Sequence, residues 1–120
     1  MIKLIADLPA NVVAFTASGQ VSAADYENTI IPLVDEKIGQ HGNIRLLYHL
    51  GPDFKKFTTT ALWDDAKIGF HHLRSFERVA VVSDVPWIQK MISGIGQALP
   101  VEVRSFAHDE LDQAKTWISE

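Results

Sequence analysis

The sequence predicts an α/β domain in which a mostly parallel five-stranded sheet carries helices, with the first strand antiparallel to the others. Within residues 61–83, an amphipathic helical pattern is followed by a four-residue turn and then by the strand pattern Arg78–Ser83, whose centre is wholly apolar. A second helical pattern then opens at Pro86, a residue favoured in the first helical turn. Helices alternating with apolar strands are typical of a buried parallel sheet. The predicted order is β-β-α-β-α-β-α-β-α.

The first two strands are expected to form a hairpin. Ile2–Ala6 and Val12–Ser18 have strand patterns, and Pro9–Ala10–Asn11 between them has the composition of a turn. A short turn joins antiparallel neighbours, which is why the first strand should oppose the rest. Gly19 is expected to end the second strand.

A helix is predicted after Ser22, which has the form of an N-cap with Asp25 as its acidic partner. Pro32 lies inside this helix and should bend it, because proline removes a backbone donor. The apolar face recurs at helical spacing through Tyr26, Ile30, Leu33, Val34 and Ile38.

The second half of the chain alternates strands and helices. Gly51–Pro52 is expected to end the third strand, which leaves Asp53–Phe57 as a loop. In order, the expected elements are a strand at Ile44–Leu50, a helix capped by one of Thr58, Thr59 or Thr60, a strand at Arg78–Ser83, a helix at Pro86–Leu99, a strand at Val101–Phe106 and a helix at Asp109–Ile118.

Composition predicts one soluble domain over residues 1–120. Hydrophobic residues make up 47% of the 120 residues and charged residues 22%, and no apolar stretch approaches the ~20 residues that span a bilayer. The chain has no cysteine, which excludes disulfides and thiolate chemistry. It opens without a signal-peptide pattern, so a cytoplasmic location is expected. A net charge of −4 argues against nucleic acid as a partner, because binding phosphates needs a basic surface.

The element order and several motifs resemble the SpoIIAA-like family, a branch of the STAS superfamily related in fold to CRAL-TRIO lipid-binding domains. The resemblance covers essentially the whole chain. Its motifs are Trp63–Asp64–Asp65, Phe70–His71–His72–Leu73, Phe76–Val82, Asp84 with Trp87, Arg104–Phe106, and Glu110–Leu111 through Ala114 to Trp117–Ile118.

The resemblance implies a small cytoplasmic protein, with apolar-ligand binding and loose membrane association as suggested roles. Sporulation-type members of the wider group are anti-sigma-factor antagonists, switched by phosphorylation of a serine where the third strand meets the next helix. Residues 50–58 read LGPDFKKFT here and lack that serine. The nearest hydroxyls, Thr58, Thr59 and Thr60, are the alternative phosphorylation sites.

Two segments are candidates for ligand contact, since ligands of open α/β sheets bind beyond the carboxyl ends of the strands. Phe54 to Phe57 places two aromatics around two lysines, a pattern that suits an apolar interface with anionic groups. The alternative is that one Phe packs in the core and both lysines are solvated. The apolar arc from Trp87 to Leu99 is wider than one packing face requires, although a wide buried face would also explain it.

Catalysis and metal binding have little support in the sequence. No nucleophile elbow or phosphate-binding glycine loop is present. His71 and His72 are adjacent on a helix and diverge by ~100°, which does not suit one shared metal ion. We therefore expect no enzyme activity, no cofactor and no metal.

The leading hypothesis is a non-enzymatic module that binds a small apolar or amphipathic, lipid-like molecule, with peripheral contact to a membrane surface. The alternative is a protein–protein regulatory module of the anti-sigma-factor-antagonist type, or a homodimer formed through the Trp87 helix. The predicted ligand-binding residues are Tyr48, His49, Phe54, Lys55, Lys56, Phe57, Trp63, Ser83, Asp84, Trp87 and Met91.

Overall fold

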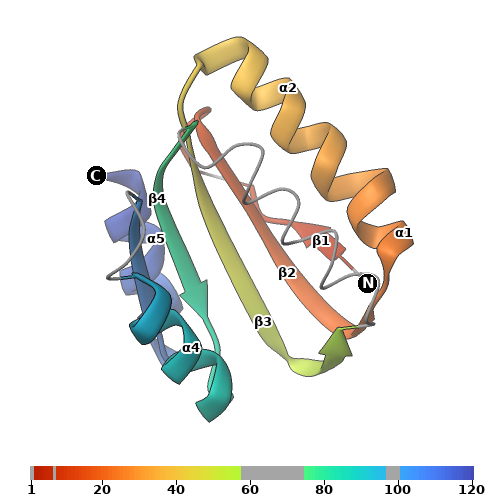
Figure 1. Ribbon diagram of the computed structural model, residues 1–120, viewed down its shortest axis with the longest axis vertical. Helices are drawn as coiled ribbons and strands as arrows, with labels where there is room; N and C mark the ends of the chain where they lie inside the picture. The colour runs from red at the N-terminus through yellow and green to blue at the C-terminus, as the bar shows by residue number, and fades with distance from the viewer. Residues whose placement is uncertain (1, 7, 58–74, 97–100) are drawn as a thin grey trace.

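The computed structural model describes residues 2–6, 8–57, 75–96 and 101–120. Five strands and three main helical regions alternate along this part of the chain (Figure 1). The strands are β1 (Ile2–Leu4), β2 (Val12–Val21), β3 (Ile44–Phe57), β4 (Phe76–Val82) and β5 (Glu102–Phe106). The helical elements are α1 (Ala23–Asp25), the π-helical η1 (Tyr26–Ile30), α2 (Ile31–His41), α4 (Pro86–Gly96), the 3-10 helix η3 (His108–Glu110) and α5 (Leu111–Ser119).

The strands form one sheet in the order β1-β2-β3-β4-β5. β1 pairs antiparallel with β2, and every later pair is parallel. The predicted fold class and the antiparallel first strand are therefore confirmed. Because the strand order never reverses, crossovers of one hand place α2 and α4 on the same face of the sheet.

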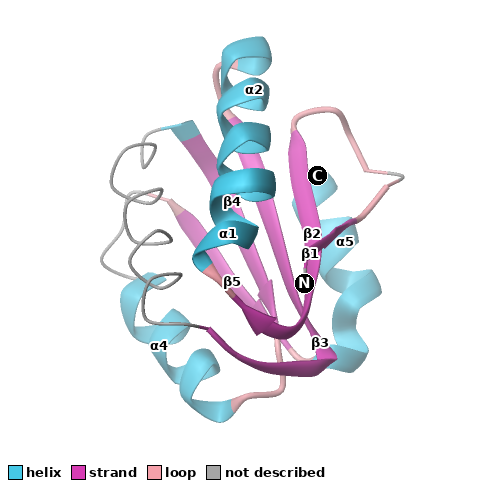
Figure 2. Ribbon diagram, turned by 90° about the vertical axis from the view of Figure 1, so that its right-hand side faces the viewer, coloured by secondary structure: helices cyan, strands magenta, loops and turns pink. Residues whose placement is uncertain are grey.

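Apolar side chains cover both faces of the sheet and form two separate cores. On one face Phe15, Tyr48 and Leu50 pack with residues from η1, α2 and α4. On the other face Leu47, Ala80 and Val82 pack with α5. Figure 2 shows α5 on the opposite side of the sheet from α2 and α4. We call these two sides the α2/α4 face and the α5 face.

The second and third strands are longer than the sequence suggested. Gly19 was expected to end its strand, but β2 continues to Val21, with Gly19 in the left-handed region at φ 60°. Gly51–Pro52 was expected to end β3, but the strand continues to Phe57, so residues 53–57 are strand and not loop. The physical reason is pairing, because Gly19–Val21 supply partners for Phe54–Phe57 across two register shifts.

The helical region after β2 is continuous from Ala23 to His41. The predicted cap is confirmed: the Ser22 backbone N–H donates to Asp25 Oδ2 at 2.8 Å, and Ser22 Oγ accepts from the Asp25 N–H at 3.4 Å. At the predicted bend, the Ile31 N–H donates to the Tyr26 carbonyl five residues back. Pro32 lies just beyond this π-helical segment, which accommodates its missing donor.

The other boundaries differ by a few residues. β1 ends at Leu4 instead of Ala6, β4 runs from Phe76 to Val82, and a 3-10 turn precedes α5. The predicted helix after Thr60 and the end of the predicted helix at Leu99 lie outside the described residues.

Two arginines from the sheet hold the C-terminal end of α5. Arg78 Nη1 donates to the Trp117 carbonyl at 2.8 Å, and Arg45 Nη1 donates to the Ile118 carbonyl at 3.0 Å. The last carbonyls of a helix have no partner within the helix, and the partial negative charge there favours a cation. The guanidinium groups of Arg78 and Arg104 also lie 5.0 and 5.2 Å from the centre of the Trp117 ring.

Replacing Arg78 with Met should lower the free energy of unfolding by about 1.5–3 kcal/mol, the range for a hydrogen bond from a charged group. Arg104→Met is the matched control, since within the described residues Arg104 shares the Trp117 ring but donates no hydrogen bond to α5. We expect the control to cost about 0.5–1 kcal/mol. Urea unfolding of both variants measures the difference, and equal losses would refute a capping role for Arg78.

Candidate functional site

The α2/α4 face of the sheet carries a row of apolar side chains that the core does not cover completely. Leu46, Val79 and Val103 are register partners across β3, β4 and β5, and all three are partly exposed. Val81, two residues along β4 from Val79, is also partly exposed on this face. Interior strands of a parallel sheet are normally covered on both sides, so this row is unusual.

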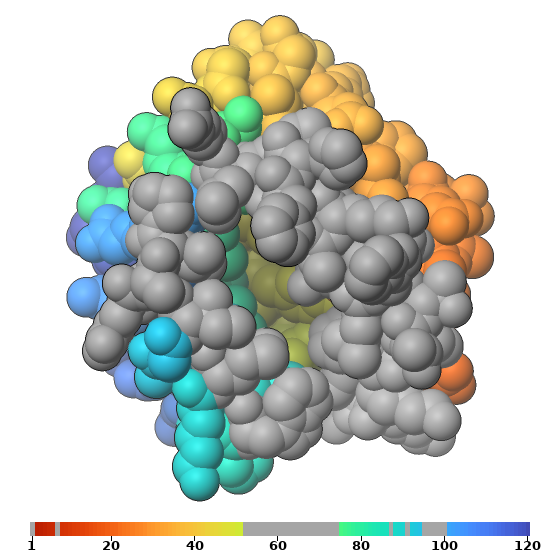
Figure 3. All heavy atoms as spheres, in the orientation of Figure 1, coloured from red at the N-terminus to blue at the C-terminus, as the bar shows by residue number. Residues whose placement is uncertain are grey.

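A hollow opens on the same face. Figure 3 shows atoms of β3 and β4 at the bottom of this hollow, in the olive and green of those strands. Val85, which precedes α4, and Ile92 of α4 are also partly buried and pack against the same core. Strands β3 and β4 thus lie at the bottom of the hollow, and α4 packs on the same face of the sheet (Figure 1).

A buried polar pair lies in the core of this face. The Tyr26 and Tyr48 hydroxyls are 3.0 Å apart, and the Tyr48 ring meets Phe15 edge-on at 4.4 Å between ring centroids. The exposed fractions of Tyr26 and Tyr48 are 1% and 7%. These hydroxyls satisfy each other, which lowers the cost of burying them.

The carboxyl edge of the sheet holds a second feature, on the α5 face. His49 is 6% exposed, and its Nδ1 lies 3.0 Å from Thr16 Oγ1. Its Nε2 lies 3.1 Å from His108 Nδ1, and the two rings stack at 5.0 Å. Burial, with the nearby charges of His108 and Lys115, lowers the pKa of His49 below its ordinary value.

Asp84 and Ser83 connect this edge to the next elements. Asp84 Oδ1 accepts the His108 backbone N–H at 2.8 Å, so the carboxylate fixes the start of η3. Ser83 is 1% exposed, and its Oγ accepts from the Val85 N–H at 3.0 Å. Gln89 Nε2 donates to the Ser83 carbonyl at 2.7 Å. These contacts lock the turn between β4 and α4.

A model of the family described as SpoIIAA-like matches residues 12–119 of the sequence. The chain belongs to the SpoIIAA-like family. Its fold is similar to that of an uncharacterised Shewanella loihica protein of the DUF3478 family, whose crystal structure is described as having a SpoIIAA-like fold. The two share 23% identity and a TM-score of 0.79 over 98% of this chain and 93% of the other. No curated protein matches the sequence.

The structure of this SpoIIAA-like domain divides the predicted ligand-binding residues between the two faces. Tyr48 points into the core of the α2/α4 face, whereas His49 faces Thr16 and His108 on the α5 face. Ser83 and Asp84 lie together after β4 and make the contacts given above. A ligand on one face of the sheet cannot contact both Tyr48 and His49.

The remaining predicted residues cannot be placed. Trp63 and Thr58–Thr60 lie outside the described residues, and so do the side chains at six positions whose backbone is described: Phe54, Lys55, Lys56, Phe57, Trp87 and Met91. Their roles stay predictions. Within the described residues, no three His, Asp or Glu side chains are grouped so that they could hold a metal ion. No described helix is long and apolar enough to cross a membrane.

The sequence analysis identified neither the partners of His49 nor the partly exposed apolar row. Thr16 and His108 lie 33 and 59 residues from His49 in sequence, and no local motif joins them. Leu46, Val79 and Val103 looked like ordinary core positions of strands. A signal did exist for the row, because alternate residues of neighbouring parallel strands share a face. It required the strand order and register, which the pattern alone does not supply.

Proposed function

We propose that this SpoIIAA-like domain is a non-enzymatic binding module that holds a small apolar or amphipathic, lipid-like molecule on the α2/α4 face of its sheet. The observation that carries the proposal is the partly exposed row Leu46–Val79–Val103 on the α2/α4 face. On this face, atoms of β3 and β4 lie at the bottom of a surface hollow (Figure 3). Covering such a row with an apolar ligand gains about 25 cal/mol per Å² of apolar surface removed from water.

The contacts on the other face support this choice of location. The polar groups of the carboxyl edge are already paired with one another through Thr16, His49 and His108. The Tyr26 and Tyr48 hydroxyls are likewise paired. Among the described residues of this face, a ligand would therefore meet mainly aliphatic groups, which favours a hydrocarbon moiety over a polar metabolite.

The test is native mass spectrometry of gently purified protein, followed by organic extraction of whatever is bound. Val79→Trp should fill the hollow, since Val79 is the central member of the row. We expect a reproducible apolar adduct on the wild type and at least a tenfold lower occupancy on the variant. Binding of 1-anilinonaphthalene-8-sulfonate, followed by fluorescence, should fall in parallel.

Leu111→Trp is the matched control, because Leu111 is also partly buried but packs on the α5 face. This control should retain the adduct and the dye. A wild-type protein without adduct or dye binding would refute the proposal. A homogeneous dimer without adduct would instead favour the protein–protein alternative. Equal losses in both variants would show that the effect is general destabilisation and not occupation of the hollow.

A further inference from the structure

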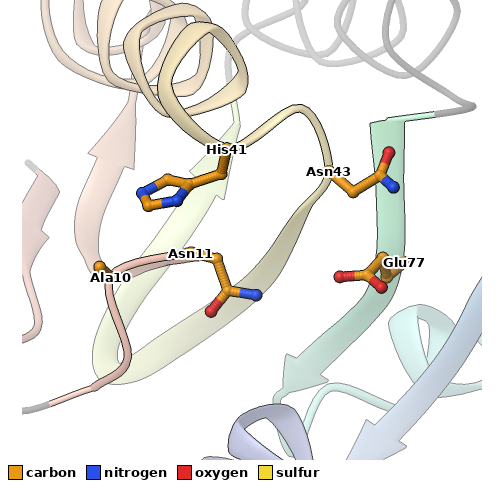
Figure 4. A pocket seen from close by; sticks show the side chains of 5 residues that line it. All are labelled: Ala10, Asn11, His41, Asn43 and Glu77. Atoms are coloured by element: carbon orange, nitrogen blue, oxygen red, sulfur yellow. The ribbon is translucent and has the colours of Figure 1, made fainter.

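A polar pocket lies at the opposite end of the sheet, beside the amino ends of β2, β3 and β4. Its volume is about 470 Å³, and its lining comes from the β1–β2 turn, the end of α2 and the start of β4. The lining residues are Ala10, Asn11, His41, Asn43 and Glu77 (Figure 4). This pocket is separate from the apolar hollow and is not explained by the proposed function.

The pocket brings together four polar side chains that make no hydrogen bond within the described part of the chain. Within the described residues, the side chains of Asn11, His41 and Asn43 make no hydrogen bond, and neither does the Glu77 carboxylate. Figure 4 shows the Glu77 carboxylate directed toward the space between the two asparagines. Three polar side chains without a described hydrogen-bond partner therefore surround the Glu77 carboxylate, and convergent polar groups of this kind can fix the orientation of a ligand.

The charge of the pocket is negative. Glu77 supplies a carboxylate, and α2 ends at His41, so the partial negative charge of the helix terminus faces the same region. Glu77 forms an ion pair with Arg45, whose Nε lies 3.7 Å from Glu77 Oε1, a separation longer than a hydrogen bond. Arg45 is held elsewhere by its bond to the Ile118 carbonyl, which leaves the Glu77 oxygens available as acceptors.

We propose that this pocket binds a guanidinium group. A guanidinium is planar and carries five donors, which match a carboxylate and two amide oxygens better than the three donors of an ammonium do. The His41 ring lies across the pocket from Glu77 (Figure 4), so it can lie against a planar cation. The group would belong to a small organic cation or to an arginine side chain of a peptide.

The test is an amide NMR titration of the wild-type protein with methylguanidinium and, separately, with N-acetyl-arginine amide. We expect saturable shifts confined to Asn11, His41, Asn43 and Glu77 and their neighbours, with roughly millimolar affinity because the carboxylate is exposed. Tighter binding of the arginine amide would assign the site to peptides, and equal binding would assign it to free cations. Methylammonium should bind more weakly than either, and equal binding of methylammonium would overturn the assignment to guanidinium.

Glu77→Gln should weaken methylguanidinium binding by about fivefold or more. Glu102→Gln is the matched control, since Glu102 is also an exposed strand glutamate paired with an arginine, at 3.2 Å from Arg78, but does not line the pocket. The control should bind as the wild type does. Shifts that do not saturate, or an equal loss in both variants, would show general charge attraction and overturn the proposal.

Discussion

Phe15→Ala should lower the free energy of unfolding by about 3–5 kcal/mol, the range for deleting a buried aromatic ring. Phe15 is 1% exposed in the centre of the α2/α4 core, where its ring meets Tyr48 edge-on. The substitution removes the ring contact and leaves a cavity between the sheet and η1. Since native domains are stable by only ~5–15 kcal/mol, a loss of this size should be visible directly in urea unfolding at 25 °C.

Leu4→Ala provides a stringent control for this prediction. Leu4 is the register partner of Phe15 on β1, yet its side chain is 51% exposed. Truncating it creates no cavity, so we expect a change within about 0.5 kcal/mol. If the two variants lost similar stability, the core of this face would not be organised around Phe15.

The hydrophobic pattern predicted the fold well because the parallel strands of this chain are buried. The apolar run around Ala80 and the helical face of Tyr26, Ile30 and Val34 all belong to the two cores. The Ser22–Asp25 cap was also predictable, because it depends on residues three apart in sequence. Local interactions and burial are the properties that a single sequence reports most directly.

The carboxyl edge was predicted less well because its geometry depends on pairing between distant segments. Gly51–Pro52 has turn composition, but the partner strand β2 extends far enough to keep the following residues in the sheet. Asp84 stands two residues before the helix that opens at Pro86, yet its carboxylate accepts from the His108 backbone 24 residues away. Short-range propensity competes with tertiary pairing at such positions, and here the pairing determines the structure.

The site predictions had the same limitation. Placing Tyr48 and His49 in one site ignored the alternation of strand side chains, which sends neighbouring residues to opposite faces. The row Leu46–Val79–Val103 could not be recognised as incompletely covered, because exposure depends on the helices that pack above it. A sequence indicates which residues are apolar, but not where a buried surface is left open.

The stability of the domain should fall as the pH drops below about 6.5, the ordinary pKa of histidine, because His49 is held neutral in the folded state. Burial, followed by the charges of His108 and Lys115, lowers the pKa of His49 on folding. Below pH 6.5 the unfolded chain therefore binds a proton at His49 more strongly than the folded chain does. The stabilisation is fully present above pH 6.5 and is lost as the pH falls toward the lowered pKa of the folded state.

The hydrogen bonds around His49 also bear on the cost of protonating it in the folded state. Its Nε2 and the Nδ1 of His108 share a single proton in their 3.1 Å contact, so one ring donates and the other accepts. Adding one proton to the pair keeps that contact, whereas protonating both rings would place two N–H groups face to face. The Asp84 carboxylate accepts from the His108 backbone and does not lie between the rings, so it does not replace the missing acceptor.

Urea unfolding at a series of pH values, from about 8 down to 5, measures this effect for the wild type, His49→Gln and His41→Gln. One linked proton contributes at most ~1.4 kcal/mol per pH unit to the slope of the free energy of unfolding against pH. His49→Gln should remove the part of the slope that arises at this site and cost about 1–3 kcal/mol at pH 8, because Thr16 and His108 lose their imidazole partner. His41→Gln is the matched control, because it removes an exposed imidazole that lies outside the carboxyl edge. A wild-type slope that persists in His49→Gln would place the responsible proton elsewhere.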